Sequence, residues 1–455
     1  MAKKEQIEDK IYSKAEINAL IKENTWLKKE NKYLKKLTNS KRFKFAEKVA
    51  TGYNGIFPIN TKRRDFLQSI GKVWHKVRNK QVKRKIAKKS QEIVNMASSY
   101  KQIIVLNSIP WDTKLRQRPH HLADEFRKLD YFVIYLEDNP LCQFRLIEDG
   151  LITINSYELL EKFQLENKFK CFLTPNNMPT EYNILQSVKG YGFGIIYDYL
   201  DEFHEDISGD LSIQLKVWDN LKKLNPILCI ATAKRLYKQL EAHLKNKKHL
   251  VMASNAVNVD HFNYQKNKVK SAPYSLKKIL SYNHPIIGFY GALAPWIDFD
   301  LINSIAKKHQ EWEFVFLGID YNGAAIDLAN YKNIHNLGAK DYQDLPSYAK
   351  YFDCAIIPFR QGEIAKATSP VKLFEYMAAG LPTVCTRDLD ECKGYDYVYM
   401  AKNDAEFEEY LKIAIKDKQN PEVRKKLLEQ AEKNTWEQRA ITIDNALKKE
   451  IKEHI

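Results

Sequence analysis

A lysine and a glutamate, Lys372 and Glu375, stand three positions apart in the stretch of this sequence with the clearest chemical content. They follow Ser369–Pro370 and precede Gly380, which predicts a short helix that begins at Val371 and ends before the glycine. The free N–H groups and the dipole at the start of a helix form a phosphate site, and Lys372 adds a positive charge to it. The alternative is that Lys372 and Glu375 form an ordinary ion pair on an exposed helix surface.

Two further candidates, Arg118 and His120, stand where the loop after the apolar run 103–106 meets a predicted helix over 119–129. From that position both can face a ligand that binds across a cleft. The alternative is that His120, or its neighbour His121, only caps the helix.

Two carboxylates, Asp198 and Asp201, directly follow the apolar run 195–197. A carboxylate at the end of a strand can orient or deprotonate a hydroxyl group of a substrate. The alternative is that Asp198 caps the turn that follows, which is common for aspartate.

Short apolar runs separated by helical stretches predict two parallel α/β sheets. Such runs occur at 103–106, 132–136, 195–197, 227–230 and 250–252, and again at 285–291, 314–318, 334–338, 354–358 and 382–385. Strands that are apolar throughout are typical of parallel sheets buried on both faces. We therefore expect two doubly wound domains, 97–275 and 276–425, a C-terminal helix over 426–455, and ligands at the carboxyl ends of the strands.

The stretch 369–384 resembles the donor-nucleotide motif of GT-B glycosyltransferases, and is most similar to glycosyltransferase family 4 and its teichuronic-acid and capsule-type relatives. Supporting segments follow in the expected order at 110–112, 117–120, 197–201, 255–257, 291–298, 336–338 and 345–346. The resemblance covers about residues 100–450. It implies two Rossmann-like domains, the first for the acceptor and the second for a nucleotide-sugar donor.

The resemblance also assigns roles to single residues. It implies that Glu375 binds both ribose hydroxyls and that Lys372, Arg360 or Arg118 neutralises the diphosphate. The first glutamate of the family pattern would fall on Ala367, and Glu363 lies nearby. The remaining donor-binding candidates are Ser369, Pro370, Val371, Gly291, Gly318 and Gly338.

The activity that the resemblance implies is transfer of a sugar, with retained anomeric configuration and without a metal or other cofactor, to a cell-surface glycan that is lipid-linked. A second hypothesis is a catalytically weak subunit of the same fold that holds a partner enzyme at a membrane. The absent glutamate at Ala367 and the absence of a cation in the loop 294–298 motivate this hypothesis.

The excess of positive over negative charge lies in the N-terminal hundred residues of the chain. The chain carries 73 Lys and Arg against 57 Asp and Glu, a net charge of +16, and residues 1–100 hold 26 and 9 of them. The rest of the chain is therefore near neutral, and an argument for a polyanionic partner applies to the first hundred residues only.

A coiled coil followed by a basic segment is predicted within those residues. Over 14–38, leucines alternate with Ile17 and two asparagines at heptad spacing, which favours a parallel dimer within a helix spanning 1–40. A single amphipathic helix is the alternative. The segment 41–96 mixes basic residues with Phe and Trp, which favours contact of 41–90 with an anionic membrane surface over a solvated linker, and over nucleic acid.

The remaining sequence features concern the compartment. The six cysteines show no C-x-x-C spacing, and Cys171 and Cys229 lie in apolar runs, so buried free thiols are expected and a metal site is not. We find no secretory signal and no apolar run long enough to span a membrane. We therefore expect a cytoplasmic protein at the inner face of the cell membrane.

Overall fold

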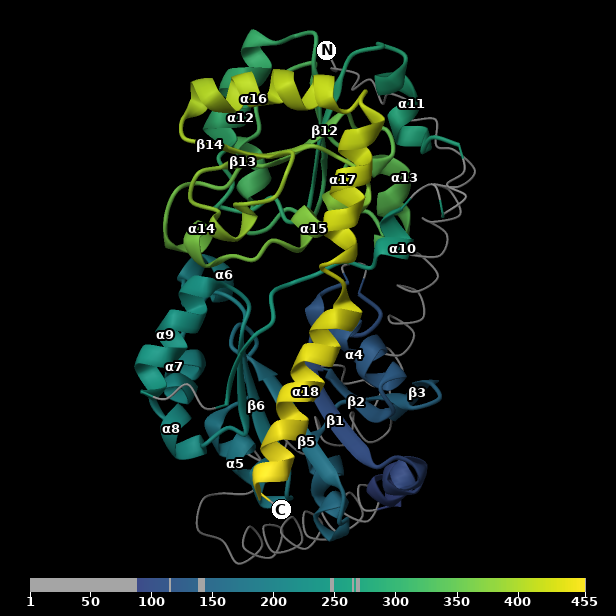
Figure 1. The fold of residues 1–455 in the computed structure, drawn as a ribbon, viewed down its shortest axis with the longest axis vertical. Helices are drawn as coiled ribbons and strands as arrows, with labels where there is room; N and C mark the ends of the chain where they lie inside the picture. Colours follow the sequence, from purple (N-terminus) through teal and green to yellow (C-terminus); the bar gives the residue numbers. More distant parts are fainter. Residues whose placement is uncertain are drawn as a thin grey trace, which may run out of the picture. The chain divides into compact units, whose positions relative to one another are not determined.

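The computed structural model describes residues 88–113, 116–137, 144–245, 249–263, 266 and 271–454 of the chain (Figure 1). The predicted coiled coil over 14–38 and most of the predicted basic segment over 41–96 lie outside the described residues. The end of that segment, residues 88–96, is helical, and its Ile93 and Val94 are buried in the core of the first domain. This end of the predicted arm is therefore part of the first domain.

The first domain is built on a sheet of eight strands in the order β3-β4-β2-β1-β5-β6-β7-β8. All neighbouring strands are parallel except β3 and β4. The strands are β1 Gln102–Ser108, β2 Tyr131–Glu137, β3 Phe144–Glu148, β4 Leu151–Ile154, β5 Phe169–Pro175, β6 Gly194–Tyr199, β7 Leu228–Ala231 and β8 Leu250–Met252. The helices are η1 Ala97–Ser99, α4 Arg118–Lys128, η2 Tyr157–Leu165, α5 Tyr182–Gly190, α6 Glu205–Ser208, α7 Ser212–Asp219, α8 Leu221–Leu224 and α9 Lys234–Leu244.

The second domain is built on a six-stranded sheet in the order β11-β10-β9-β12-β13-β14, with every neighbouring pair parallel. The strands are β9 Ile286–Tyr290, β10 Glu313–Leu317, β11 Ile334–Asn336, β12 Cys354–Ile357, β13 Thr383–Thr386 and β14 Val398–Ala401. The helices are α10 Val259–Phe262, α11 Tyr274–Leu280, α12 Phe299–Lys308, η3 Ala324–Asp327, η4 Tyr342–Asp344, α13 Leu345–Ala349, α14 Glu363–Ala367, α15 Val371–Ala378, η5 Asp390–Cys392, α16 Asp404–Asp417 and α17 Pro421–Glu432. The predicted pair of parallel α/β sheets is confirmed.

Most strands that the apolar runs predict are buried, although β8 and β11, at sheet edges, are only partly buried. Every residue of β2, β9 and β12 is buried, as expected of parallel strands covered on both faces. The sequence did not predict β3, β4 or β14, and both β3 and β14 are partly exposed strands at sheet edges. Cys171 and Cys229 are buried free thiols, as predicted. The second core begins at Val257, ahead of the predicted boundary after residue 275.

The C-terminal part of the chain returns from the second domain to the first. Helices α16 and α17 pack on the second domain, whereas α18 Trp436–His454 lies along α4 of the first (Figure 1). The single helix expected over 426–455 is thus divided at 433–435. The Tyr131 hydroxyl of the first sheet donates a 2.9 Å hydrogen bond to Asp444 of α18.

The chain therefore crosses between the domains twice, and the two crossings are hydrogen-bonded to each other. The N–H of Val257 donates to the carbonyl of Asn434 at 3.0 Å, and the N–H of Trp436 donates to the carbonyl of Val257 at 3.3 Å. Val257 and Thr435 form an isolated parallel bridge. Both crossings are thus held side by side.

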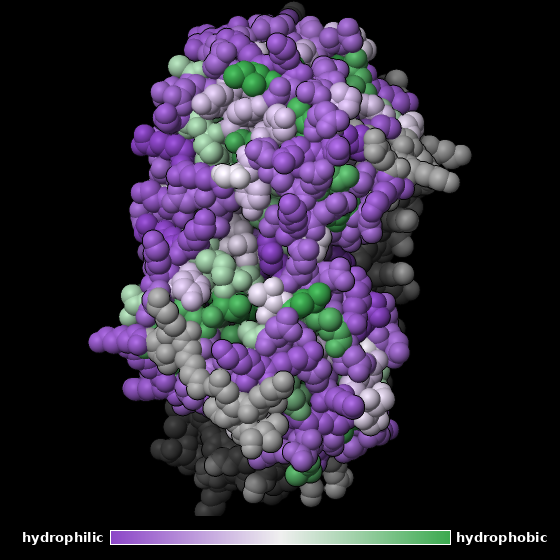
Figure 2. All heavy atoms as spheres, in the orientation of Figure 1, coloured by the Kyte–Doolittle hydropathy of each residue, from purple (hydrophilic) through white to green (hydrophobic). Residues whose placement is uncertain are grey.

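The face of the molecule drawn in Figure 2 is mainly hydrophilic. On the face drawn in Figure 2, hydrophobic residues reach the surface in small separate groups. Of the helices in the described ranges, none combines the length and the apolar character that a membrane span requires. The membrane contact expected of residues 41–90 stays a prediction.

Substitution of Gly288 in β9 tests how tightly the second core is packed. A Cβ at Gly288 would lie 1.9 Å from Cδ2 of Phe352, so Gly288→Ala must displace a buried ring. We expect the free energy of unfolding to fall by about 1–3 kcal/mol, measured by denaturant titration. Gly190→Ala is the control, because a Cβ there meets no atom within 4 Å. Equal stability of the two variants would contradict this packing.

Candidate functional site

Helix α15 carries the lysine and the glutamate that the sequence singled out. It follows Pro370, whose backbone is extended with φ −74° and ψ 116°, and no side chain of the described residues caps it. It ends at Gly380, which has a φ of +65°, and the N–H of Leu381 donates to the carbonyl of Tyr376 at 2.9 Å. The predicted helix is confirmed, although Pro370 stands just before its first turn rather than within it.

The side chains of Lys372 and Glu375 are not an exposed ion pair. Glu375 is only 6% exposed, and Nζ of Lys372 lies 4.6 Å from the ring centroid of Phe289 and 5.3 Å from that of Phe359. The ammonium reaches the end of β9, where a Cβ at Gly291 would lie 2.8 Å from Nζ. The alternative of an ordinary surface pair is therefore wrong.

Burial shifts the pKa values of both groups in the direction that favours the neutral form of each. It raises the pKa of Glu375 to about 8, an effect that Lys372 and the hydroxyl of Tyr290 oppose. It lowers the pKa of Lys372 to about 8, which Glu375 opposes. A buried lysine in this state gains from a bound anion, because the added negative charge favours the ammonium form.

Three predicted glycines meet at the carboxyl ends of three adjacent strands. The N–H of Gly318 donates to the carbonyl of Gly338 at 3.2 Å, and a Cβ at Gly318 would lie 1.8 Å from the carbonyl oxygen of Gly291. Gly291 itself has a φ of +128°, which disfavours any side chain. The structure thus brings Gly291, Gly318 and Gly338 together, with Lys372 beside them, and keeps this edge of the sheet free of side chains.

Two other donor candidates, Arg360 and Glu363, are engaged elsewhere. Nε of Arg360 donates to the carbonyl of Ile297 at 3.2 Å, and its guanidinium is 3.8 Å from Asp300. Glu363, at the start of α14, forms an ion pair with Arg235 of the first domain. The structure does not bring either side chain to Lys372, and their roles in donor binding stay predictions.

Arg118 and Asp198 form a buried ion pair in the first domain. Nε of Arg118 donates to Oδ2 of Asp198 at 2.9 Å and Nη2 donates to Oδ1 at 3.3 Å, and neither residue is more than 3% exposed. Burial raises the pKa of Asp198, while Arg118 acts in the opposite direction. Both candidates are brought together, but each neutralises the other rather than facing solvent.

His120 is the helix cap that the sequence offered as the alternative. Its Nδ1 accepts from the N–H of Gln117 at 3.2 Å, and its Nε2 lies 3.1 Å from the hydroxyl of Tyr135. The residue is fully buried, so neither ring nitrogen reaches a ligand in this conformation. Its neighbour His121 stacks on Trp436 of α18 with ring centroids 4.9 Å apart.

Asp201 differs from Asp198 in its surroundings. It is partly buried just beyond β6, and the Asn177 amide donates to its Oδ2 at 2.7 Å. Burial raises its pKa, and the bond from Asn177 opposes that change. No partner of Oδ1 occurs among the residues that the structure describes, which leaves this oxygen available to a ligand.

Ser369 connects the start of α15 to the segment that joins the domains. The N–H of Asn255 donates to Oγ of Ser369 at 3.2 Å, and the Asn255 amide donates to the Ser369 carbonyl at 2.7 Å. The preceding carbonyl, that of Ser254, accepts from Arg118 at 3.2 Å and from Arg439 at 3.0 Å. The ion pair of the first domain is thus linked to the helix that carries Lys372 and Glu375.

The second domain is similar to a known family of proteins. Residues 284–417 match the family described as glycosyl transferases group 1. The second domain is therefore similar to group 1 glycosyl transferases over these residues. Its matched residues include α15 and the three strand-end glycines.

One curated relative is similar to this chain over a short stretch. The putative teichuronic acid biosynthesis glycosyltransferase TuaH of Bacillus subtilis (strain 168) is 33% identical over 104 residues, which is 22% of this chain. The match spans 26% of the length of that relative.

Solved structures of similar fold cover both domains. Anabaena HepE in complex with UDP and glucose aligns with a TM-score of 0.55 at 14% identity, over 77% of this chain and 100% of its own. Sucrose-phosphate synthase from Thermosynechococcus elongatus aligns with a TM-score of 0.56 at 13% identity, over 76% and 98%. The two domains together therefore have the fold of these structures, the GT-B fold.

Several residues that shape the second domain and its link to the first domain were not predicted from the sequence. The N–H of Tyr290 donates to the Tyr376 hydroxyl at 3.0 Å, which holds α15 on β9. Arg439 bonds to the link between the domains from α18. Tyr376 lies within the recognised stretch and could have been found there, whereas nothing near Arg439 in the sequence indicates its partner.

The ion pair predicts a particular pattern of stability changes. Asp198→Ala leaves a buried guanidinium without its anion, and we expect a loss of about 3–5 kcal/mol in the free energy of unfolding. The double variant Arg118→Met/Asp198→Leu should lose less than the single variant, because no buried charge remains. Asp300→Ala is the control, since Asp300 is exposed. Additive losses in the double variant, measured by denaturant titration, would refute the pairing.

The buried His120 predicts a loss of stability in acid. Burial first, and then the charge of Arg116, lower its pKa from 6.5 to about 4. Between these values the unfolded chain takes up a proton that the folded chain does not, so stability falls as the pH decreases from 6.5 to 4. The contribution is about 3 kcal/mol. His120→Gln should show a shallower fall in unfolding free energy over this range, and parallel curves would count against it.

Proposed function

We propose that this protein is a glycosyltransferase that moves a sugar from a nucleotide-sugar donor to a glycan acceptor. The observation that carries the proposal is the partly buried Lys372 and the buried Glu375, one turn apart at the start of α15, beside a strand edge lined by glycines. A positive charge, a free helix N-terminus and a buried carboxylate suit a diphosphate followed by a ribose.

In this proposal each part of the donor has its own partner. The N–H groups at the start of α15 and the ammonium of Lys372 bind the diphosphate and stabilise its charge as it leaves. Glu375 accepts hydrogen bonds from both ribose hydroxyls. Gly291 leaves room for the ammonium of Lys372 at the end of β9, where it can meet the phosphates. The transfer needs no metal, because the helix and Lys372 supply the positive charge.

The relatives support a nucleotide-sugar donor. HepE was solved in complex with UDP and with UDP-glucose, and TuaH is named as a putative teichuronic acid biosynthesis glycosyltransferase. We therefore propose a cell-surface polysaccharide as the acceptor, lipid-linked and reached from the cytoplasmic face. Retention of anomeric configuration, a parallel dimer through 14–38 and membrane contact through 41–90 belong to the same proposal.

For the acceptor we propose that Asp201, rather than Asp198, orients the reacting hydroxyl. Asp201 has an oxygen without a partner in the described part of the chain, and burial raises its pKa, which suits a base. Asp198 and Arg118 act as positioning residues through Ser254.

A catalytically weak scaffold is the second candidate. Ala367, which replaces the first glutamate of the family pattern, is fully buried, and Arg360 donates to the carbonyl of Ile297. Both observations reduce the polar groups available around a donor. The two candidates differ in donor turnover.

A thermal-shift screen against UDP-, GDP- and dTDP-sugars tests the donor site. We expect one nucleotide class to stabilise the protein, by about 2.7 kcal/mol at a hundredfold excess over Kd. Glu375→Ala should weaken that donor about 10- to 100-fold, the cost of hydrogen bonds to a charged group. Glu429→Ala, an exposed glutamate of α17, is the matched control and should bind as the wild type does.

Turnover decides between the two candidates. Donor hydrolysis and transfer by the purified chain should drop in Glu375→Ala and persist in Glu429→Ala. Equal, background-level turnover in the wild type and in both variants would reject the enzyme proposal and favour the scaffold function. The absence of any donor-induced stabilisation in the wild type would overturn the proposal of a nucleotide-sugar site.

A further inference from the structure

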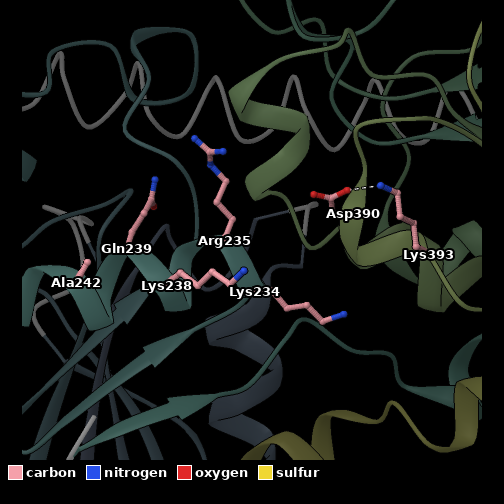
Figure 3. A pocket seen from close by; sticks show the side chains of 7 residues that line it. All are labelled: Lys234, Arg235, Lys238, Gln239, Ala242, Asp390 and Lys393. Carbon is pink, nitrogen blue, oxygen red and sulfur yellow. Dashed lines mark hydrogen bonds and ion pairs between the residues drawn. The ribbon is translucent and has the colours of Figure 1, made fainter. Parts of the chain in front are cut away.

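A second concave site lies apart from α15, between α9 and the segment around η5 (Figure 3). Its volume is about 670 Å³, within the range of pockets that bind small molecules, roughly 300–1,000 Å³. The lining residues are Lys234, Arg235, Lys238, Gln239 and Ala242 from α9, and Asp390 and Lys393 from the other wall. None of these residues takes part in the proposed donor site.

The lining carries more positive than negative charge. Asp390 is paired with Lys393 across one turn. Lys234 and Lys238 are exposed, and neither ammonium has a carboxylate partner in the ranges that the structure describes. In Figure 3 both lysines extend toward the wall that carries Asp390 and Lys393. Two lysines whose ammonium groups have no carboxylate partner among the described residues therefore belong to the lining of one pocket.

Side-chain hydrogen bonds connect α9, which forms one wall of the pocket, to Glu202 and to Tyr199 of β6. Arg235 bonds to Glu202 at 3.2 Å, and the Gln239 amide donates to the same carboxylate at 3.0 Å. The hydroxyl of Tyr199, a buried residue of β6, donates to Gln239 at 3.0 Å. This network orders one face of α9, so Lys234 and Lys238 project from a fixed support.

The start of α9 already attracts a carboxylate. The helix has 11 residues, no acidic residue in its first turn and no side-chain cap on Ala233. The N–H of Lys234 instead donates to Oε1 of Glu391, from the opposite wall, at 2.8 Å. Glu391 thus matches the dipole at the start of α9, and the positive charge left for a ligand comes from Lys234 and Lys238.

We infer that this pocket binds the carboxylate or phosphate group of a saccharide, so that the acceptor is an anionic glycan. The inference rests on the proposed function, since it names the chemistry of the acceptor. Arg235 connects the pocket to that function, because its guanidinium also pairs with Glu363, in the segment that leads to Ser369 and α15. An acceptor anchored by its negative charge here lies next to the loop that borders the donor.

Lysines on a convex helix face are usually only solvated, but these two face a second wall. A neutral glycan would gain nothing from two ammonium groups in a cavity, whereas a uronate or a sugar phosphate would neutralise them.

Binding by the full-length chain tests the inference without any turnover. Isothermal titration calorimetry with tri-galacturonate, glucose 6-phosphate and neutral maltotriose measures the three affinities. We expect at least one of the two anions to bind at least tenfold more tightly than maltotriose. Lys234→Ala/Lys238→Ala should weaken that anion at least tenfold and leave the donor-induced thermal shift unchanged. The tighter of the two anions identifies the charged group.

Lys222→Ala/Lys223→Ala is the matched control, because both lysines are exposed on α8 and outside the pocket. An equal loss in this control, unchanged binding in the pocket variant, or maltotriose binding as tightly as the anions would overturn the inference. If the anions bind but no nucleotide sugar stabilises the protein, the anion pocket stands and the proposed transferase function is refuted. If a nucleotide sugar stabilises the protein but neither anion binds, the proposed donor site stands and the anion pocket is refuted.

Discussion

The buried ion pair of Arg118 and Asp198 in the first domain is connected by hydrogen bonds to the second domain. A buried guanidinium and a buried carboxylate each require a partner, because neither can be solvated where it lies. Arg118 uses a further donor on the carbonyl of Ser254, and the next residue, Asn255, bonds to Ser369 at the start of α15. The end of β6 is thereby connected to the helix that carries Lys372 and Glu375.

Much of this arrangement could be predicted from the sequence, because it depends on neighbours along the chain. Strands such as β9 and β12 are apolar throughout, since they are covered on both faces, whereas β3 and β14 lie at sheet edges and lack that pattern. Lys372 and Glu375 lie within one helix turn, so their spacing alone sets their relative positions. The bounds of α15 follow from Ser369–Pro370 and Gly380 in the same way.

Contacts between distant residues could not be predicted, because a sequence gives the type of a side chain and not its partner. The family resemblance offers both Arg118 and Arg360 as cations for a diphosphate, yet one neutralises Asp198 and the other bonds to a backbone carbonyl. Glu363 pairs with Arg235, which is 128 positions away. The burial that shifts the pKa of Glu375 likewise depends on the packing of α15 against β9.

The paired crossings between the domains have a mechanical consequence. A single connecting strand would allow one domain to swivel and to bend against the other. Here two covalent connections run side by side and are bonded at Val257, Asn434 and Trp436, so swivelling would strain both at once. Bending about the line that joins them is the remaining soft motion. Such a joint acts as a hinge with a single axis.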